Sequence, residues 1–397
     1  MLKLLCVTIA GICALVIAMG IGRFAYTPIF PLMQEALHFS NADAGYIAAS
    51  NYFGYLLGAL LGSRVQKSNK QKVFRVSLVI NILCNGAMAL TTSLVGWAVY
   101  RFISGISSGI VFVLASSMTL DFLASKNRSA WSGLFYSGVG IGIVISGLFV
   151  PFLNQLADWR GAWLGLMLLC LLLSPAPLFW TEDSRKSVVS DTETIQTQQD
   201  QNASFFYWLL ASYGLEGLGY IITGTFLVDI AMSSPSTKEV SSLSWVIAGL
   251  GAIPSTLFWA WVGKRYGHVR TLVCAYLLQA IGIVIPVVQS NATGILLSAF
   301  LFGGTFMGIT TLATSLARNI SDQSNRSIGY LTACYGIGQI LGPIAGALIE
   351  QQTHSYSWSL IGAAIIIFVG GVLLVMGRYA SCSQTIQVSR RGGYHVE

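Results

Sequence analysis

The 397-residue sequence has few charged residues: Asp, Glu, Lys and Arg make up 9% of it, whereas hydrophobic residues make up 54%. An ordinary soluble domain has about 25% charged residues, and a chain of this length needs many of them to form a polar surface. This scarcity excludes a soluble enzyme, a disordered chain and a nucleic-acid-binding module. The composition is that of an integral membrane protein.

Three further absences exclude particular chemistries. The sequence has no Cys-x-x-Cys motif and no cluster of Cys and His residues, and six of its seven Cys lie in apolar stretches, where a free Cys acts as a small hydrophobic residue. All four His lie in loops or in the C-terminal tail, and no GxxxxGKS/T phosphate-binding loop occurs. We therefore expect no cofactor, no metal site, no enzymatic activity and no use of ATP.

Twelve apolar segments are long enough to cross a bilayer as helices, which requires about 20 apolar residues each. They lie at 5–33, 42–65, 73–92, 95–119, 129–153, 160–180, 205–232, 241–262, 271–289, 293–316, 326–349 and 357–378. They are too long for strands and lack the alternation of a membrane β-barrel. The first segment resembles a signal peptide, but its removal would leave an odd number of spans, so we interpret it as an uncleaved helix.

The basic residues indicate how these spans are oriented. Eighteen of the 22 Lys and Arg residues lie on one side, Arg160 and Lys238 lie on the other, and Arg23 and Arg101 lie within spans. Because short basic loops stay on the cytoplasmic side of a membrane, we expect both termini of this multi-pass protein to be cytoplasmic.

A polar segment divides the chain into two similar parts. It has the composition of a flexible linker, and across it the sequence repeats at a spacing near 201 residues, with Gly62-Ser63-Arg64 aligned to Gly263-Lys264-Arg265. We predict an all-α integral membrane protein of two six-helix pseudo-repeats: an N-terminal half at 1–180, a cytoplasmic linker at 181–204, a C-terminal half at 205–378 and a cytoplasmic tail at 379–397. Secondary transporters of this build bind substrate near the midplane, between the halves.

Two motifs resemble those of the major facilitator superfamily. Arg101, Gly105 and Gly109 in span four match its RxxxGxxxG spacing, and the loops that contain Arg64 and Arg265 resemble its basic signature, GxxxDRxGRR. Both loops have Gly where the Asp is usual. This resemblance covers the whole chain and implies the fold of that superfamily.

A narrower resemblance is to the YbfB/YjiJ family of the same superfamily. It is carried by Gly-Ile-Gly-Arg-Phe-Ala-Tyr-Thr-Pro at 20–28, by Asn-Tyr-Phe-Gly-Tyr at 51–55 and by Glu-Gly-Leu-Gly-Tyr at 216–220. It implies a permease of the bacterial inner membrane but no particular substrate. Gly342 and Pro343 in span eleven resemble a motif that antiporters of the superfamily carry in span five, so we expect packing or gating there and predict no direction of transport.

Charged residues within spans indicate the site, because a charge at bilayer depth costs about 2.5–3.5 kcal/mol and usually faces the protein interior. Glu216, Tyr220 and Thr223 are spaced i, i+4, i+7 and share one face of span seven. Glu216 either carries protons or binds substrate, or it is a permanent partner of a buried Arg. Arg23 either binds an anionic group of the substrate or pairs with Glu216, or it reaches the lipid headgroups from the outer end of its span.

Four more polar residues extend the candidate site, since they either hydrogen-bond a solute or hold helices together. They are Tyr26, Asn51, Tyr55 and Gln339. Pro28 and Pro31 are expected to break or kink the first span just beyond Arg23. Arg101 shares one face with Gly105 and Gly109, which favours a packing role over one in gating or proton coupling.

These features predict a secondary active transporter that moves a small organic solute by alternating access and is coupled to protons. Its expected partners are the solute, protons and membrane lipid, with no nucleic acid, and the protein is expected to be a monomer. One fixed cation and one titratable acid suit an anion, a zwitterion or a neutral solute carried with a proton. The alternative is a transport-inactive sensor or scaffold with the permease fold, which would bind a ligand that does not cross.

Overall fold

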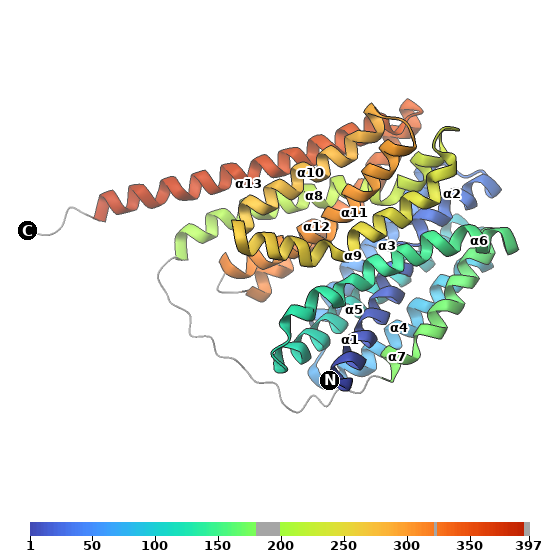
Figure 1. Ribbon diagram of the computed structural model, residues 1–397, viewed down its shortest axis with the longest axis horizontal. Coiled ribbons are helices and arrows are strands. Elements are labelled where there is room, and N and C mark those ends of the chain that lie inside the picture. The colour runs from blue at the N-terminus through green and yellow to red at the C-terminus, as the bar shows by residue number, and fades with distance from the viewer. Residues whose placement is uncertain (180–198, 321–323, 393–397) are drawn as a thin grey trace, which may run out of the picture.

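The protein is helical throughout most of the residues that the structure, a computed structural model, describes: 1–179, 199–320 and 324–392 (Figure 1). Ten helical segments among these residues are long and apolar enough to cross a membrane. The prediction of an all-helical membrane protein is confirmed. The predicted linker lies outside the described residues up to position 198.

The N-terminal half contains a discontinuous first span followed by longer helices. Its main elements are α1 (Leu2–Leu15), the π-helical turn η1 (Val16–Ile21), α2 (Tyr26–Leu37), α3 (Asn41–Ser63), α4 (Lys70–Ala87), α5 (Leu94–Ser125), α6 (Ser132–Leu173) and α7 (Pro175–Leu178). Short 3-10 turns flank α4 and precede α6, at Lys67–Asn69, Met88–Leu90 and Ser129–Trp131.

The C-terminal half contains six long helices and one short turn. They are α8 (Gln199–Met232), the 3-10 turn η5 (Lys238–Val240), α9 (Ser241–Tyr266), α10 (His268–Val288), α11 (Ala292–Ile320), α12 (Ser324–Thr353) and α13 (Tyr356–Gly392). The last helix continues beyond the end of span twelve that we expect at 378.

Two features reconcile the twelve predicted spans with the ten apolar segments. α6 contains the fifth and sixth spans, which meet at Ala157 and Asp158, where the backbone leaves the helical conformation with φ values of −157° and 53°. α3 is the second span, but it is not among the ten. Its one charged residue is Asp43, so its many Gly, Ser, Asn and Tyr residues account for its lower hydropathy.

Local sequence explains where individual helices begin and end. α3 begins at a capping box, in which the Asp43 N–H donates to Ser40 Oγ at 3.1 Å and the Ser40 N–H donates to the Asp43 carboxylate at 3.0 Å. α9 ends before Gly267, whose φ of 90° lies in a region that suits glycine. This glycine allows the sharp turn into α10.

The first span breaks before its two prolines and not at them. In and after η1 the N–H groups of Gly22 and Phe24 donate five residues back, to Ile17 and Met19, and helix resumes at Tyr26. Pro28 then lies in the first turn of α2, where its missing N–H needs no partner. The break at residues 22–25 leaves backbone carbonyls without helical partners, and it lies at Arg23.

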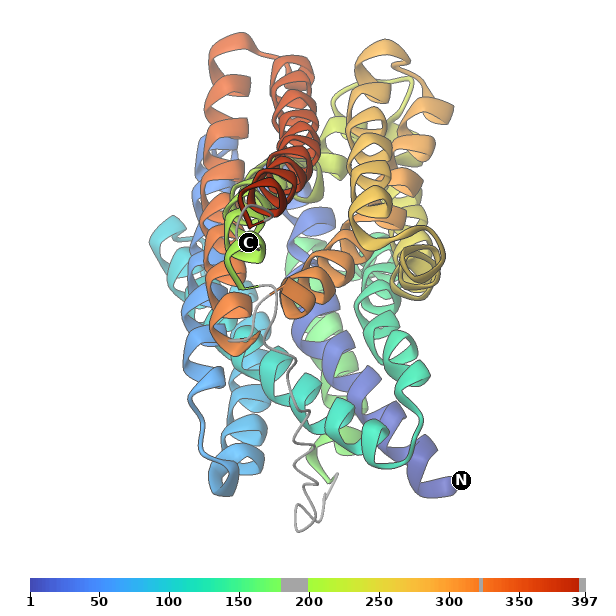
Figure 2. The same cartoon turned by 90° about the vertical axis from the view of Figure 1, so that its left-hand side faces the viewer.

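The two halves meet through α3 with α12 and through α6 with α9. Figure 1 shows that the helices of the two halves converge near the end of α2 and diverge toward the end where the N-terminus lies. Figure 2 shows the connection between α12 and α13 at the end opposite to the N-terminus. At the convergent end Thr27 Oγ1 donates to the Gly224 carbonyl at 2.7 Å, and Asn41 Nδ2 donates to Glu350 at 2.6 Å. The halves are therefore closed against each other on the predicted outer side.

Candidate functional site

Arg23 lies in the break of the first span, and its side chain is only 3% exposed. Its guanidinium carbon lies 4.3 Å from the ring centroid of Tyr55, 4.8 Å from that of Tyr52 and 5.3 Å from that of Phe24. Nε and Nη2 have no hydrogen-bond partner among the described residues. The rings offset part of the cost of burying the charge, while two donor groups remain available to an anion.

Aromatic and amide side chains of the C-terminal half lie near this guanidinium. Tyr220 of α8 and Tyr335 of α12 are within electrostatic reach of Arg23, and Gln339 of α12 donates to the Tyr220 hydroxyl. The Tyr220 ring is nearly parallel to that of Tyr335, at 5.5 Å and 15°, and to that of Phe306, at 6.0 Å and 8°. Both halves therefore contribute to the surroundings of one buried cation.

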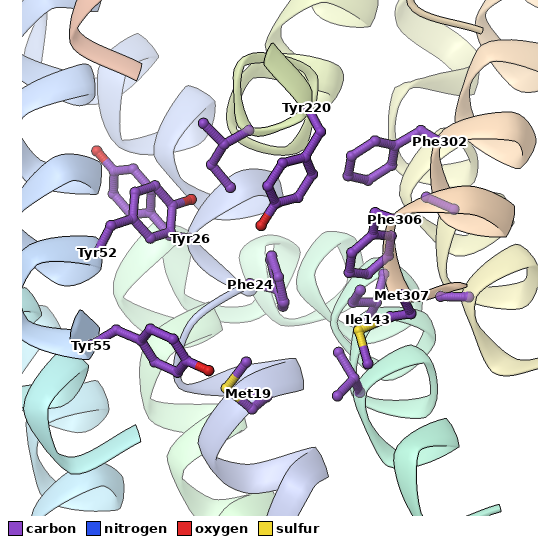
Figure 3. Packing of buried hydrophobic residues seen from close by; sticks show 14 of the residues in the cluster. Met19, Phe24, Tyr26, Tyr52, Tyr55, Ile143, Tyr220, Phe302, Phe306 and Met307 are labelled. Atoms are coloured by element: carbon purple, nitrogen blue, oxygen red, sulfur yellow. The ribbon is translucent and has the colours of Figure 1, made fainter. Parts of the chain in front are cut away.

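Figure 3 shows how the rings are distributed around this region, with Tyr52 and Tyr55 on one side and Tyr220, Phe302 and Phe306 on the other. The term central site is used below for the polar and aromatic side chains around the guanidinium: Arg23, Tyr52, Tyr55, Tyr220, Tyr335 and Gln339. A fixed cation among ring faces suits a small solute that has an anionic group and an apolar body.

Arg101 of α5 supports the broken span by hydrogen bonds to its backbone. Its Nη1 donates to the Gly22 carbonyl and its Nη2 to the Arg23 carbonyl, both at 3.0 Å. These carbonyls are the ones that the break leaves without helical donors. The Arg101 guanidinium also lies 4.8 Å from the centroid of the Tyr26 ring. Arg101 therefore positions the backbone from which the Arg23 side chain projects.

Two of the predicted site residues hold helices of the N-terminal half together. Asn51 Nδ2 donates to the Arg101 carbonyl at 2.8 Å, and the Tyr26 hydroxyl donates to a backbone carbonyl of α3 at 3.1 Å. Asn51 Oδ1 has no partner among the described residues. Both side chains are buried and contact the elements that carry the central site.

The predicted glycine positions lie at close helix contacts. A Cβ at Gly105 would overlap the backbone of α3 at Asn51, and one at Gly109 would overlap it at Tyr55. Gly342 of α12 packs in the same way against α8, and the Pro343 carbonyl faces Gly45 of α3 in the other half. The RxxxGxxxG stripe thus allows α5 and α3 to approach closely, whereas Pro343 lies at the interface between the halves.

Glu216 lies on α8 one turn before Tyr220 of the central site. It is fully buried, and neither of its carboxyl oxygens has a hydrogen-bond partner among the described residues. Gln279 of α10 lies beside the carboxyl. Arg23 and Glu216 therefore form no ion pair in this structure. Thr223 is also buried, and its hydroxyl has no partner in the described chain.

Arg64 and Arg265 lie at helix ends, outside the central site. Arg64 is the C-cap residue of α3, and both side chains are exposed. The Arg265 guanidinium lies 5.9 Å from the centroid of the Trp261 ring. Their placement matches that of the two basic loops, one in each half.

Sequence analysis did not assign Tyr52 to the central site, and it did not single out Phe306, which packs on Tyr220, or Tyr276 and Gln279, which lie near Glu216. Aromatic residues within apolar spans give no signal of their own, because core rings have the same pattern. Gln279 was detectable, since it is a polar residue in the interior of span nine and Tyr276 precedes it by three residues on the same face.

A separate cavity of about 350 Å³ lies at the convergent end, between the two halves. Its lining includes Gln34 and Glu35 of α2, Asp229 of α8 and Lys238 of η5. The Lys238 ammonium lies 4.0 Å from the Glu35 carboxylate, with side chains 59% and 66% exposed. Asp229 accepts a hydrogen bond from the Tyr356 hydroxyl at 2.5 Å. This cavity shares no lining residue with the central site.

Two six-helix halves around a buried cation and its rings are the architecture of a membrane transporter that binds its solute between the halves. Comparison with known families agrees: the family described as "Uncharacterised MFS-type transporter YbfB" matches residues 15–375. The chain belongs to this family and is a transporter of the major facilitator superfamily, as its motifs indicate.

Individual relatives are distant but similar over most of their length. The chain is 24% identical to the gentisate transporter of Corynebacterium glutamicum, over 89% of this chain and 82% of the relative. It is 24% identical to the sialic acid transporter NanX of Escherichia coli, over 80% of each. It is 22% identical to the 4-hydroxybenzoate transporter PcaK of Acinetobacter baylyi, over 91% of this chain and 90% of the relative.

The fold is also similar to that of a solved transporter. The crystal structure of a variant of the nucleoside transporter NupG superimposes with a TM-score of 0.68 at 15% identity, covering 96% of this chain and 99% of that one. This similarity confirms the fold of the major facilitator superfamily, and at such low identity it shows the fold alone.

Proposed function

We propose that this protein is a secondary active transporter that moves a small organic carboxylate across the bacterial inner membrane by alternating access. The single observation that carries the proposal is Arg23, a buried cation between the two halves. Its Nε and Nη2 groups have no hydrogen-bond acceptor among the described residues. A carboxylate accepts such donors in a bidentate arrangement, which a neutral solute does not match.

The surrounding side chains suit the rest of such a solute. Rings from both halves provide apolar faces for its body. The Tyr55 hydroxyl beside Arg23 and Gln339 Oε1, which has no partner among the described residues, provide polar groups. The relatives named for gentisate, 4-hydroxybenzoate and sialic acid carry carboxylic acids. A common carboxylate group supports the assignment of this chemical class to the present chain.

The contacts between the halves support alternating access. Thr27 and Asn41 each donate across the interface at the convergent end, so a solute from that side reaches Arg23 only after these contacts separate. We place both termini on the opposite, cytoplasmic side, and we propose that one chain forms the complete transport unit because both halves of the central site belong to it.

Proton coupling completes the proposal, with Glu216 as the carrier. It is an acid buried within a span, and no described cation pairs with its carboxyl. A permanent partner of a buried Arg would be held by that Arg, and Glu216 is not. This favours the titrating role over the structural one.

A thermal-shift screen tests the proposed solute class. Purified protein is heated with a series of organic carboxylates and with their neutral amides, for the native chain and for Arg23→Gln. A ligand at 100 times its dissociation constant stabilises the native state by about 2.7 kcal/mol, so carboxylates should raise the melting temperature of the native chain and leave the variant unshifted. Equal stabilisation by acids and amides, or by acids in both proteins, would contradict the proposal.

A further inference from the structure

Three polar side chains meet inside the C-terminal half without satisfying one another. They are Glu216 of α8 and Tyr276 and Gln279 of α10, and each is 0% exposed. The two carboxyl oxygens of Glu216, both amide atoms of Gln279 and the Tyr276 hydroxyl make no hydrogen bond of ordinary length and angle with any described residue, although Gln279 lies beside the carboxyl and Ser212 lies beside the phenol. Five unpartnered polar atoms at one buried place are rare in native proteins. These three side chains are called the acid compartment below.

The surroundings of the acid compartment favour a neutral carboxyl. Gln279 lies beside Glu216, and the titratable groups within electrostatic reach of the carboxyl are phenols: Tyr213 and Tyr220 of α8, Tyr276 of α10 and Tyr335 of α12. α13 contributes a backbone group to these surroundings: its Gly370 carbonyl accepts a hydrogen bond from the Ser212 hydroxyl of α8. A carboxylate without a cation or several donors is costly in such a place.

A neutral carboxyl can instead use the groups that are present. Its O–H can donate to the Gln279 carbonyl oxygen, and its other oxygen can accept from the Gln279 amide or from the Tyr276 hydroxyl, because an amide both donates and accepts. Small rotations of these side chains would satisfy most of the unpartnered atoms. The compartment therefore matches a proton-loaded acid better than an ionised one.

The acid compartment and the central site have no side chain in common, but they adjoin each other: both use α8, and Tyr220 and Tyr335 of the central site are within electrostatic reach of Glu216. Glu216 and Tyr220 are four residues apart on α8, yet Glu216 faces α10 whereas Tyr220 accepts from Gln339 beside Arg23. A movement of α8 that accompanies a change in the central site therefore also moves Glu216 relative to Gln279. The shared helix provides a physical connection between bound solute and bound proton.

We propose that Glu216 binds the coupling proton in a compartment of the C-terminal half that is separate from the solute site, with Gln279 and Tyr276 as its hydrogen-bond partners. This inference rests on the proposed function, because solute-driven movement of α8 opens and closes the compartment. A proton from water on one side forms the O–H bond of the Glu216 carboxyl. The same bond breaks when the compartment opens to the other side, and one proton crosses per cycle.

Infrared difference spectroscopy tests the compartment without any solute. The C=O stretch of a neutral, buried carboxyl is recorded on purified protein at a series of pH values. We expect a band that is absent in Glu216→Gln, present in the control Asp229→Asn, and shifted in Gln279→Leu and Tyr276→Phe. An identical band in the native chain and in Glu216→Gln would overturn the inference, whatever the solute screen gives.

A matched pair of glutamine variants tests whether the two sites are separate. Gln279→Leu should shift the carboxyl band and change the affinity for the stabilising carboxylate by no more than about twofold. Gln339→Leu should leave the frequency of the band unchanged and weaken that affinity about tenfold, which equals about 1.4 kcal/mol. The reverse pattern, or equal effects of both variants on affinity, would contradict a separate proton compartment. If Glu216→Gln does not fold, Glu216→Asp should retain a band at a shifted frequency.

Discussion

Arg23 and Arg101 are two buried cations with different surroundings. Arg101 donates through both terminal nitrogens to the Gly22 and Arg23 carbonyls, so backbone oxygens of the broken span stabilise its charge, and Nε is its one buried nitrogen without a described partner. Arg23 is surrounded by rings and keeps two unpartnered nitrogens. Of the two, Arg23 has the donors that a solute anion needs, and Arg101 has the contacts that hold Arg23 in place.

Arg101→Gln should weaken solute binding although Arg101 does not belong to the central site. An amide cannot reach both carbonyls at once, so the break at residues 22–25 loses one or both donors. We expect the KM for transport to rise about tenfold, a loss of about 1.4 kcal/mol, with a smaller rise for Arg101→Lys, which keeps one charged donor. Initial rates over a range of solute concentrations measure both. An unchanged KM in Arg101→Gln would show that Arg23 needs no such support.

At the scale of helices, the discontinuous first span depends on close packing against α6. A Cβ at Gly20 would overlap the backbone of Gly142 and the reverse also holds, so the two backbones are in direct contact. Asn81 of α4 extends this support, since its amide lies between the serines of α5 at 2.9 to 3.2 Å. The Ser108 hydroxyl in turn donates to the Ala18 carbonyl of η1 at 2.6 Å.

Gly142→Val should destabilise the N-terminal half. Forcing extra carbon atoms into a packed interface costs about 1–3 kcal/mol, which should lower the melting temperature and the yield of folded protein. The matched control is Gly362→Val, because no heavy atom lies within 4 Å of a Cβ at Gly362 on α13. Thermal unfolding of both variants in detergent measures the difference. Equal melting temperatures for the two would contradict the close contact between η1 and α6.

The sequence predicted the helices better than their interruptions. Segments of about 20 mostly apolar residues identify every long helix in the described chain, including α3, whose hydropathy is lower than that of the others. The break at Arg23 was expected at Pro28 and Pro31, because proline is the visible signal, whereas the observed break depends on Arg101 from another helix. Likewise, helical spacing placed Glu216 and Tyr220 on one face, but neighbouring helices divide that face between two environments.

At the scale of the whole molecule, the halves are closed at the predicted outer end by polar contacts that differ in how far their side chains are exposed to solvent. Asn41 Nδ2 donates to Glu350 at 2.6 Å in a partly buried position. The Lys238 and Glu35 side chains are 4.0 Å apart and mostly exposed. A hydrogen bond to a charged group contributes about 1.5–3 kcal/mol, whereas exposed ion pairs contribute about 0–1 kcal/mol.

Asn41→Ala should therefore shift the protein toward a state that is open on the outer side, and Glu35→Gln should not. Spin labels at Leu37→Cys of α2 and Leu243→Cys of α9, in a background without the native Cys, report the separation of the halves by pulsed electron resonance. We expect a second, longer distance to become populated in Asn41→Ala only. A distribution in Asn41→Ala that matches the native one would show that this contact does not hold the halves together.

The most direct test of the central claim is counterflow in proteoliposomes. Vesicles that contain the purified protein are loaded with the carboxylate found in the thermal-shift screen, diluted into a trace of the labelled compound, and sampled over time. A transient accumulation of label by the native chain and by Glu216→Gln, together with its loss in Arg23→Gln, is the predicted result. Undiminished counterflow by Arg23→Gln, or binding of the carboxylate without any counterflow by the native chain, would contradict the assignment of Arg23 as the anion-binding residue of a transporter.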